Sequence, residues 1–347
     1  MQDKARPGSG ERTRVGLREV AAVAGVSTAT VSRVLNRPET VSEALRGRVT
    51  AVIDRLGWVP NAAARALASN RTGAIGAVFP ALVGDLARAI DAMQDVLGAR
   101  NHLLLLARSQ YDADLEFSQA RKLVERGVDG LILVGCTRAP AYEQFLARVE
   151  VPFVNSFVYN EAAQGPCVGP DNARAMAEVV DYLVALGHRR FALISHSMRN
   201  NDRATARRDG VRAALMRHGL AIPPHLVLEG QWSIANGRRL FRQVLATDPR
   251  PTALLFGNSL LAVGAVLEAA KMGVRVPEEL SIVGHDDTEF MSELPTPIST
   301  VRVAAEEVGS AAADLIVDMV EGRSGVTGRR IASELVIRAT TGPAPAS

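Results

Sequence analysis

Apolar residues recur at helical spacing near the start of the chain. The first group predicts a short helix, and its members are Leu17, Val20, Ala21 and Ala24. Gly25 then suits a tight turn, because glycine adopts positive φ without steric cost. Ser27 is placed to cap a second helix over 28–35, whose buried face would hold Val31, Val34 and Leu35. Two short helices joined by a glycine-containing turn predict a helix-turn-helix unit or a plain helical hairpin.

A third helix is predicted from Ser42, its N-cap, to Gly57, where the apolar stripe ends. The stripe consists of Leu45, Val49, Val52, Ile53 and Leu56. When the apolar faces are buried, the second helix must expose Thr28, Ala29, Ser32 and Arg33. Small polar groups and one cation near a helix N-terminus form a surface that can enter the major groove of DNA.

From Gly73 onward, short apolar runs alternate with amphipathic stretches. The runs are AIGAVF (74–79), HLLLLA (102–107), DGLILVG (129–135), VPFVNS (151–156), FALIS (191–195), TALLFG (252–257) and LSIVG (280–284). Continuous apolar runs between helices are typical of parallel strands that are covered on both faces. The roughly 275 residues with this pattern are enough for two lobes.

The charge distribution separates these two parts of the chain. Residues 1–72 hold 12 Lys and Arg against 6 Asp and Glu, whereas the remainder holds 28 against 31. A basic head on a slightly acidic body fits a polyanion-binding module joined to another domain, although a solvated basic tail gives the same balance. The polar first 14 residues lack the apolar segment of a secretory signal, and no run of 18 apolar residues predicts a membrane span.

Several classes of site are not indicated by the sequence. It has no GxxxxGK[ST] phosphate loop, no HExxH helix and no convincing Ser/His/acid constellation, and His188 in LGHRR is expected to be structural. The two cysteines, Cys136 and Cys167, are too few for a disulfide framework or a cysteine-rich zinc site. They are expected to be inert thiols in a reducing cytoplasm. No enzyme activity, metal or cofactor is therefore predicted.

The run from Val20 to Ser69 resembles the DNA-binding head of the lactose-repressor (LacI/GalR) family. The resemblance rests on AxxAGVSxxTVSRVLN (21–36), on VS near residue 42 and on LGWVPNAAARxL (56–67). It implies that Thr28 and Ala29 face bases in the major groove and that Arg33 lies at the same interface. The residues that it implies for phosphate contacts or for the geometry of the motif are Ser27, Thr30, Ser32 and Asn36. The segment VSEALRG (41–47) is similar to that of gluconate-type repressors.

The resemblance also implies a hinge helix and linker over 60–72. Pro60 and Asn61 mark the start of an alanine-rich stretch that is too short to hold a helix alone in water. In the family this helix orders when two copies pair on the minor groove. Leu67 matches an apolar wedge between the central base steps, whereas without the resemblance a core leucine would be the simpler interpretation. Asn61 and Arg65 of the same segment are expected to contact DNA.

The resemblance continues through the core in YLVALGHRR (182–190), VPEELSIVGHDDT (276–288), PISTVR (297–302) and RATT (338–341). It implies a two-lobed α/β fold like that of periplasmic sugar-binding proteins, with two parallel sheets flanked by helices. The expected order is a disordered tail (1–14), an all-α helix-turn-helix head (15–59), the hinge (60–72) and the core (73–347). One lobe is expected over about 73–168 and 300–325, and the other over about 171–296 and 329–341. The chain should cross between them near Asp171, near Pro297 and near the C-terminus.

Polar residues follow several of the predicted strands, where ligands of open α/β sheets bind. Asn258 and Asp286 each come directly after a strand. The resemblance implies that Arg207 binds an effector and that Trp232 places an aromatic ring over it. Phe79 ends the first strand and forms either a pocket wall or part of the core. Three of the others also have a structural alternative: Arg207 as a solvated arginine, Asp286 as a turn cap and Trp232 as a core side chain.

Two departures from the family leave the ligand open. Val83-Gly84-Asp85-Leu86 stands where the family often has Asn-Pro followed by two aromatic residues, and Ser259 replaces a frequent acidic residue. The ligand is therefore expected to be a sugar, a sugar acid or another small metabolite.

Together these features predict a sequence-specific DNA-binding transcriptional regulator, a repressor, that is cytoplasmic and has no membrane partner. A homodimer should bind a near-palindromic double-stranded operator, and a small-molecule effector between the core lobes should control its affinity, in a direction that the sequence leaves open. The C-terminal TTGPAPAS has no heptad repeat, so a tetramer is not expected. The alternative is a solute-binding protein of a transport system, which would share the core but has no use for a DNA-binding head.

Overall fold

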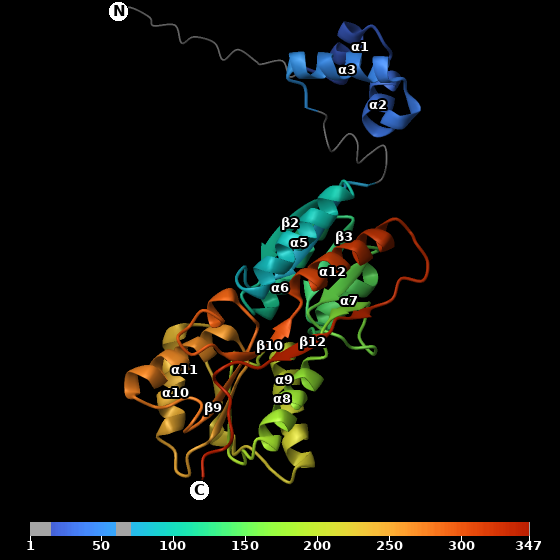
Figure 1. The fold of residues 1–347 in the computed structure, drawn as a ribbon. Coiled ribbons are helices and arrows are strands. Elements are labelled where there is room, and N and C mark those ends of the chain that lie inside the picture. The colour runs from blue at the N-terminus through green and yellow to red at the C-terminus, as the bar shows by residue number, and fades with distance from the viewer. Residues whose placement is uncertain (1–14, 60–70, 347) are drawn as a thin grey trace, which may run out of the picture. The chain divides into compact units, whose positions relative to one another are not determined.

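The structure is a computed structural model that describes residues 15–59 and 71–346. The chain divides into two units between Thr72 and Gly73, a head and a core (Figure 1). The expected hinge helix, with Asn61, Arg65 and Leu67, lies outside the described residues. Among the described helices, none is long and apolar enough to cross a membrane.

The head contains the three predicted helices, α1 (Leu17–Ala24), α2 (Thr28–Asn36) and α3 (Glu43–Leu56), with a short 3-10 turn, η1 (Pro38–Thr40). The predicted ends are confirmed. Gly25 and Gly57 follow α1 and α3 with φ of 67° and 59°, a region that favours glycine. Ser27 and Ser42 cap α2 and α3, because their side chains accept hydrogen bonds from backbone N–H groups one turn later.

The apolar stripes of the three helices meet in a small core. Its buried members are Val20, Ala21, Ala24, Val31, Val34, Val49 and Val52. Val26, in the turn between α1 and α2, packs against this cluster. The arrangement is a helix-turn-helix rather than an isolated helical hairpin, since α3 packs against both α1 and α2.

The first lobe of the core is a six-stranded parallel sheet. Its order is β11 (Arg329–Arg330), β5 (Cys167–Gly169), β4 (Phe153–Ser156), β3 (Gly130–Val134), β1 (Ala74–Phe79) and β2 (Leu103–Arg108). One face packs against α5 (Asp85–Ala99) and α12 (Ala305–Val320), and the other against α6 (Ala113–Glu125) and α7 (Pro140–Arg148). Ile132 and Val134 of β3 face the first helix pair, whereas Leu131 and Leu133 face the second, as the two-residue period of a strand requires.

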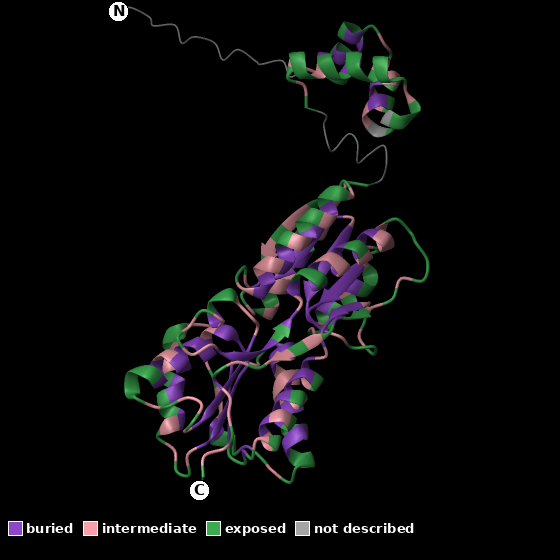
Figure 2. Ribbon diagram, in the orientation of Figure 1, coloured by how far each residue is buried: buried purple, intermediate pink, exposed green. Residues whose placement is uncertain are grey.

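The second lobe repeats this three-layer plan. Its sheet has the order β12 (Ser333–Val336), β10 (Ser299–Val303), β9 (Ser281–His285), β8 (Ala253–Phe256), β6 (Phe191–Ser195) and β7 (Val227–Glu229), in which only β12 is antiparallel. The helices α8 (Asn172–Ala185) and α9 (Asp202–Arg217) lie on one side, and α10 (Ile234–Leu245) and α11 (Ser259–Met272) on the other (Figure 1). Short 3-10 turns are η2 (Pro224–Leu226) and η3 (Glu289–Met291). Figure 2 shows buried residues along the strands and the inner faces of these helices.

The chain crosses between the lobes three times, and two of the expected lobe boundaries differ from those observed. After β5 it crosses at Asp171, as predicted. The second crossing follows β10 rather than lying near Pro297, because Ser299 to Val301 pair with β9 and keep this segment in the second lobe. The third lies between β11 and β12, so 329–330 belong to the first-lobe sheet and not, as expected, to the second lobe.

Candidate functional site

The first candidate site is the exposed side of α2 in the head. Thr28, Ala29 and Arg33 are exposed there, because Val31 and Val34 direct the opposite side of the helix into the core. Ser32 is half-buried, and Asn36 is the last residue of α2. The predicted surface of small side chains and one cation is therefore present on the helix.

Ser27 and Thr30 organise the N-terminal end of this helix. Ser27 Oγ accepts a hydrogen bond from the backbone N–H of Thr30 at 3.1 Å and lies 2.9 Å from Thr30 Oγ1. Their hydroxyls are thus engaged with each other, which fits a role in the geometry of the motif. The described head carries six arginines against four acidic residues, so the surface around α2 favours a polyanion.

The second candidate site is a cavity of about 60 Å³ between the two lobes of the core. The first lobe lines it with Asp85, Tyr111 and Phe157. The second lobe supplies most of the polar lining, with Asn172, Arg203, Arg207, Trp232, Asn258, His285 and Asp286. Four of the five residues that were predicted to bind an effector therefore meet in one place: Arg207, Trp232, Asn258 and Asp286.

Phe79, the fifth, does not line the cavity. It is fully buried at the end of β1, and its ring meets that of Phe157 edge-on, with centroids 6.5 Å apart. Phe157 lines the cavity, so Phe79 supports the wall from behind. Of the two interpretations that the sequence left open, the core position is the one observed.

Arg207 and Asp286 are connected through the imidazole of His285. Arg207 Nη1 donates to Asn172 Oδ1 at 3.1 Å and to His285 Nε2 at 3.3 Å. His285 Nδ1 then donates to Asp286 Oδ1 at 2.9 Å. Because a guanidinium can only donate, Nε2 must be the accepting nitrogen and the proton must sit on Nδ1. A neutral imidazole therefore separates a buried cation from a carboxylate.

The pKa directions agree with this assignment. Burial, and then the nearby Arg207 charge, lower the pKa of His285 and keep its imidazole neutral. Burial alone would raise the pKa of Asp286, but His285, whose Nδ1–H bonds to the carboxylate, and Arg207 hold it below its usual value. Asp286 is thus ionised.

Asp286 is held in an unusual backbone conformation. Its φ is 68°, in the left-handed region where aspartate is among the few side chains tolerated. The hydroxyl of Thr300 on β10 donates to its carbonyl oxygen at 3.2 Å. This turn directly after β9 places the carboxylate in the cavity.

Four buried polar atoms of the lining have no hydrogen-bond partner within the described residues. Three are donors: Arg207 Nε, Trp232 Nε1 and Asn258 Nδ2. The fourth is Asp85 Oδ2. The other amide atom of Asn258, Oδ1, caps α11 by accepting from Leu261 N–H at 3.0 Å. Because buried polar groups are nearly always hydrogen-bonded, this set indicates a site for a polar ligand.

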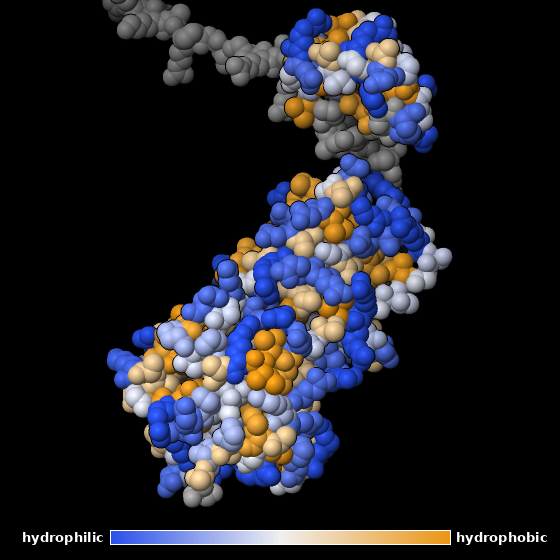
Figure 3. Space-filling view, in the orientation of Figure 1, coloured by the Kyte–Doolittle hydropathy of each residue, from blue (hydrophilic) through white to orange (hydrophobic). Residues whose placement is uncertain are grey.

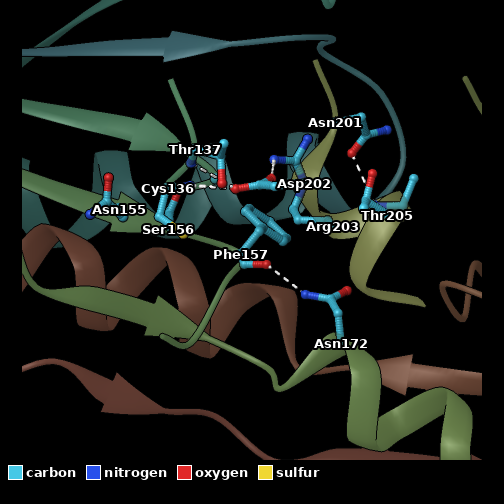
Figure 4. Close-up of polar contacts among 12 residues, drawn as sticks. Cys136, Thr137, Asn155, Ser156, Phe157, Asn172, Asn201, Asp202, Arg203 and Thr205 are labelled. Atoms are coloured by element: carbon cyan, nitrogen blue, oxygen red, sulfur yellow. Dashed lines mark hydrogen bonds and ion pairs between the residues drawn. The ribbon is translucent and has the colours of Figure 1, made fainter. Parts of the chain in front are cut away.

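A carboxylate clamp joins the lobes beside the cavity (Figure 4). Asp202 Oδ2, at the start of α9 in the second lobe, accepts from the backbone N–H groups of Cys136 at 2.6 Å and Thr137 at 3.0 Å, in the first lobe. Burial opposes ionisation, yet Arg203 and these two N–H groups hold the pKa of Asp202 below its usual value. Asn172 Nδ2 adds a bond to the Phe157 carbonyl oxygen at 3.1 Å.

A larger cavity of about 700 Å³ is lined by the clamp residues Cys136, Thr137 and Asp202. It shares Asn172 and Asn201 with the first cavity. Residues of both lobes line it, including Phe117 and Tyr142 from the first lobe and Met198 from the second. Cys136 lies on its wall, and both cysteines are free thiols.

Several lining residues were not predicted from the sequence. Asp85 was noted only as a departure from the family, and His285 stands beside Asp286 in GHDD, where adjacency was the available signal. Tyr111, Phe157 and Asn172 carry no motif. They reach the cavity because the two lobes are placed face to face, which local patterns do not encode.

Two family models match the chain. The model described as "Bacterial regulatory proteins, lacI family" matches residues 16–61, and the one described as "Periplasmic binding protein-like domain" matches 180–341. The first covers the described helix-turn-helix, and the second covers most of the second lobe together with α12.

Full-length proteins resemble the chain as well. The HTH-type transcriptional regulator GntR of Escherichia coli K12 is 29% identical over 90% of this chain and 94% of its own length. The ribose operon repressor of the same strain is 30% identical over 88% of this chain and 92% of its length. A crystal structure of the lac repressor dimer bound to operator and an anti-inducer is 27% identical, with a TM-score of 0.84 over 95% of this chain and all of that chain.

Proposed function

This chain belongs to the lacI family of bacterial regulatory proteins, and from that premise we propose that a small polar metabolite in its inter-lobe cavity sets the affinity of its head for operator DNA. As a member of that family, the chain is a DNA-binding transcriptional regulator. The observation that carries the effector proposal is the set of four unpaired buried polar atoms that line one cavity. A repressor that is controlled by a ligand needs both a DNA-binding head and an effector site.

For the head, we propose that Thr28, Ala29 and Arg33 read base edges in the major groove. Their exposure at the start of α2 supports this role. Ala29 has no polar group, so it offers apolar contact alone, for example to a thymine methyl. Ser27, Thr30, Ser32 and Asn36 are proposed to hold phosphates or the motif, and Asn61, Arg65 and Leu67 to contact the minor groove from the hinge.

Arg33→Ala tests this surface, with Arg55→Ala as a matched control, because both arginines are exposed on head helices. A duplex selected from a random pool by the parent protein serves as the probe. Arg33→Ala should weaken binding by about tenfold to a hundredfold and relax base preference at one position of each half-site. Arg55→Ala should keep the base preference of the parent. Equal binding by Arg33→Ala and the parent, measured by fluorescence anisotropy, would remove Arg33 from the interface.

For the core, we propose that the effector is a sugar or a sugar acid. Three unpaired donors, one of them on the Arg207 guanidinium, suit the hydroxyl and carboxylate oxygens of such compounds, and the Trp232 ring suits a sugar face. That one relative is a ribose operon repressor favours the same class. The cavity is small beside the several hundred Å³ of typical ligand sites, so binding requires the lobes to move apart.

A thermal-shift screen over sugars and sugar acids tests the effector proposal. A ligand that binds the folded state stabilises it by about 2.7 kcal/mol at one hundred times its Kd. We expect at least one compound to raise the melting temperature of the parent and to change its affinity for the selected duplex. Stabilisation without any change in DNA affinity would contradict the proposed control.

We further propose that two chains pair through their cores and present two heads to a near-palindromic operator. The lac repressor that this chain resembles is a dimer on its operator. The core leaves large apolar side chains exposed, among them Leu82, Val83, Leu103, Leu106 and Phe290. Figure 3 shows apolar patches on one face of the core, within a mostly hydrophilic surface. Sedimentation equilibrium should give the mass of two chains.

The proposed function includes no catalytic step.

A further inference from the structure

Asp85 occupies a fixed position at the start of α5 in the first lobe. It follows Gly84, whose φ of 56° favours glycine. A Cβ at Gly84 would lie 3.3 Å from the ring of Trp232, so the turn packs closely against the second lobe. Asp85 is only 4% exposed and lines the inter-lobe cavity. Its carboxyl group therefore stands where the lobes meet.

The two oxygens of this carboxyl group differ. Oδ1 accepts a hydrogen bond from Arg88 Nη2 at 2.6 Å, one turn along the same helix. Oδ2 is buried and has no partner within the described part of the chain. Arg88 is about one third exposed and also lies 3.4 Å from Glu306 of α12, so its charge is shared. Oδ2 of Asp85 is thus available for a hydrogen bond to another molecule.

Burial and two neighbouring carboxylates oppose the ionisation of Asp85, whereas Arg88 favours it. Arg88 faces it from its own helix, Glu306 from α12 and Asp286 from the second lobe. Burial, with a further contribution from Asp286, raises the pKa of Asp85 to about 8. At neutral pH the group therefore carries a proton when no ligand is present, and a ligand cation would expel it.

We propose that Asp85 selects the effector by a hydrogen bond between its free Oδ2 and a hydroxyl or ammonium group of the ligand. This inference rests on the proposed function of the cavity. The three unpaired donors, Trp232 Nε1, Asn258 Nδ2 and Arg207 Nε, meet acceptor oxygens on the rest of the ligand. The effector is then a polyhydroxylated compound or its amino derivative, with any anionic group away from Asp85 and Asp286.

Isothermal titration calorimetry with a panel of aldoses, their aldonic acids and glucosamine tests this proposal. The variants are Asp85→Ala and Asp85→Asn, with Asp91→Asn on the exposed side of the same helix as the control. Affinity for the bound compound should fall by about tenfold or more in Asp85→Ala, because a buried hydrogen bond is lost. It should stay within about threefold of the parent in Asp91→Asn. Unchanged binding of the selected duplex shows that each variant is folded.

Two features of the titration show whether Asp85 bonds to an ammonium group or to a hydroxyl group of the ligand. If an ammonium group binds, it displaces the Asp85 proton, so the measured enthalpy at pH 7 depends on the ionisation enthalpy of the buffer. Asp85→Asn then loses the affinity. If a hydroxyl group binds, no proton is released, and Asp85→Asn retains most of the affinity because an amide still bonds to a hydroxyl.

Two results would overturn the proposal. If Asp85→Ala binds the same compound as tightly as the parent, Asp85 takes no part in recognising the effector. The proposed effector site itself is then unaffected. If the parent binds no member of the panel but still prefers its selected duplex, the inferred class of effector is wrong. The proposed role in DNA binding is then unaffected.

Discussion

His285 is the residue on which the charge distribution of the cavity depends. It is 1% exposed, accepts from Arg207 through Nε2 and donates to Asp286 through Nδ1. A lysine at this place could donate to Asp286 but could not accept from Arg207, because an ammonium group has no acceptor. The buried guanidinium is thereby held in position for a ligand, and its Nε remains unpaired.

Arg207→Ala should abolish the effector response and spare operator binding. The change removes a half-buried cation that lines the cavity and leaves the helix that carries it intact. Arg208→Ala is the control, since Arg208 pairs with Asp209 beside it and lies outside the cavity lining. Operator affinity with and without the compound found by thermal shift is the measurement. A normal response in Arg207→Ala would remove this residue from the site.

Asp287 makes a pH-dependent contribution to stability. Arg338 binds both of its oxygens, at 2.7 and 3.0 Å, and Arg302 Nε donates to Oδ2 at 2.9 Å. Burial opposes ionisation, but these arginines hold the pKa of Asp287 below its usual value. The contribution is therefore fully present above the unfolded pKa of about 3.9 and is lost as pH falls through the lower folded pKa.

Asp287→Asn should lower the free energy of unfolding by about 2 kcal/mol at pH 7, because charged hydrogen bonds are replaced by weaker ones. The difference from the parent should shrink below about pH 4. Glu334→Gln is the control, since its exposed carboxylate also meets Arg302 and should matter by less than about 0.5 kcal/mol. Urea unfolding at several pH values measures both. A constant difference between pH 7 and pH 2.5 would contradict the assignment.

Residues that follow apolar strands were predictable as parts of the site. Asn258 and Asp286 come directly after β8 and β9, at the carboxyl edge where ligands bind. His188 was also predicted correctly as structural, since it is buried between Thr252 and Ser281. Asp85 could not be predicted, because the cavity residues that it faces, such as Trp232 and Asp286, lie far along the chain in the other lobe.

At the scale of elements, close helix pairs hold the layers together. α12 returns to the first lobe after the second crossing and packs along α5. Gly309 lies at this contact, and a Cβ there would collide with the carbonyl oxygen of Ala89. α12 can approach α5 closely because this position carries no side chain.

Gly309→Ala should therefore destabilise the core by about 1–3 kcal/mol, since the helices must separate to admit a methyl group. Gly98→Ala on α5 is the matched control, because no atom lies within 4 Å of its Cβ position. Alanine there should be neutral or should stabilise by up to about 1 kcal/mol, through its higher helix propensity. Urea unfolding followed by circular dichroism compares the two. Equal losses in both variants would contradict the close-packing argument.

All seven apolar runs that predicted strands form strands, and six of them leave a continuous apolar signal because they are buried in a parallel sheet. The seventh, β2, lies at a sheet edge with Leu103 and Leu106 exposed, so it is not covered on both faces as expected. The other five strands gave no such signal. β5, β7 and β11 have two or three residues, and the apolar residues of β10 and β12 are interrupted by polar ones such as Arg302 and Glu334. That β10 stays in the second lobe was missed for this reason, and the second crossing was placed too early.

At the scale of the whole molecule, the cavity and the clamp lie at the same boundary between the lobes. Asp202 holds the loop at Cys136 and Thr137, and the ring of Tyr111 lies 4.4 Å from that of His196 across the same boundary. A ligand that separates or draws together the lobes must change these contacts. Coupling between two sites is typically worth about 1–3 kcal/mol and is reciprocal, so operator DNA should change effector affinity by the same factor.

The most direct measurement is competition between labelled promoter fragments and bulk genomic DNA for the purified full-length protein, over several salt concentrations and with the candidate metabolites. We expect one fragment to be preferred by about a thousandfold or more, with a slope against salt that reflects phosphate contacts. One metabolite should change that affinity by about fivefold to a hundredfold. If no fragment outcompetes bulk DNA under any of these conditions, the exposed side of α2 does not read an operator, and the account is contradicted.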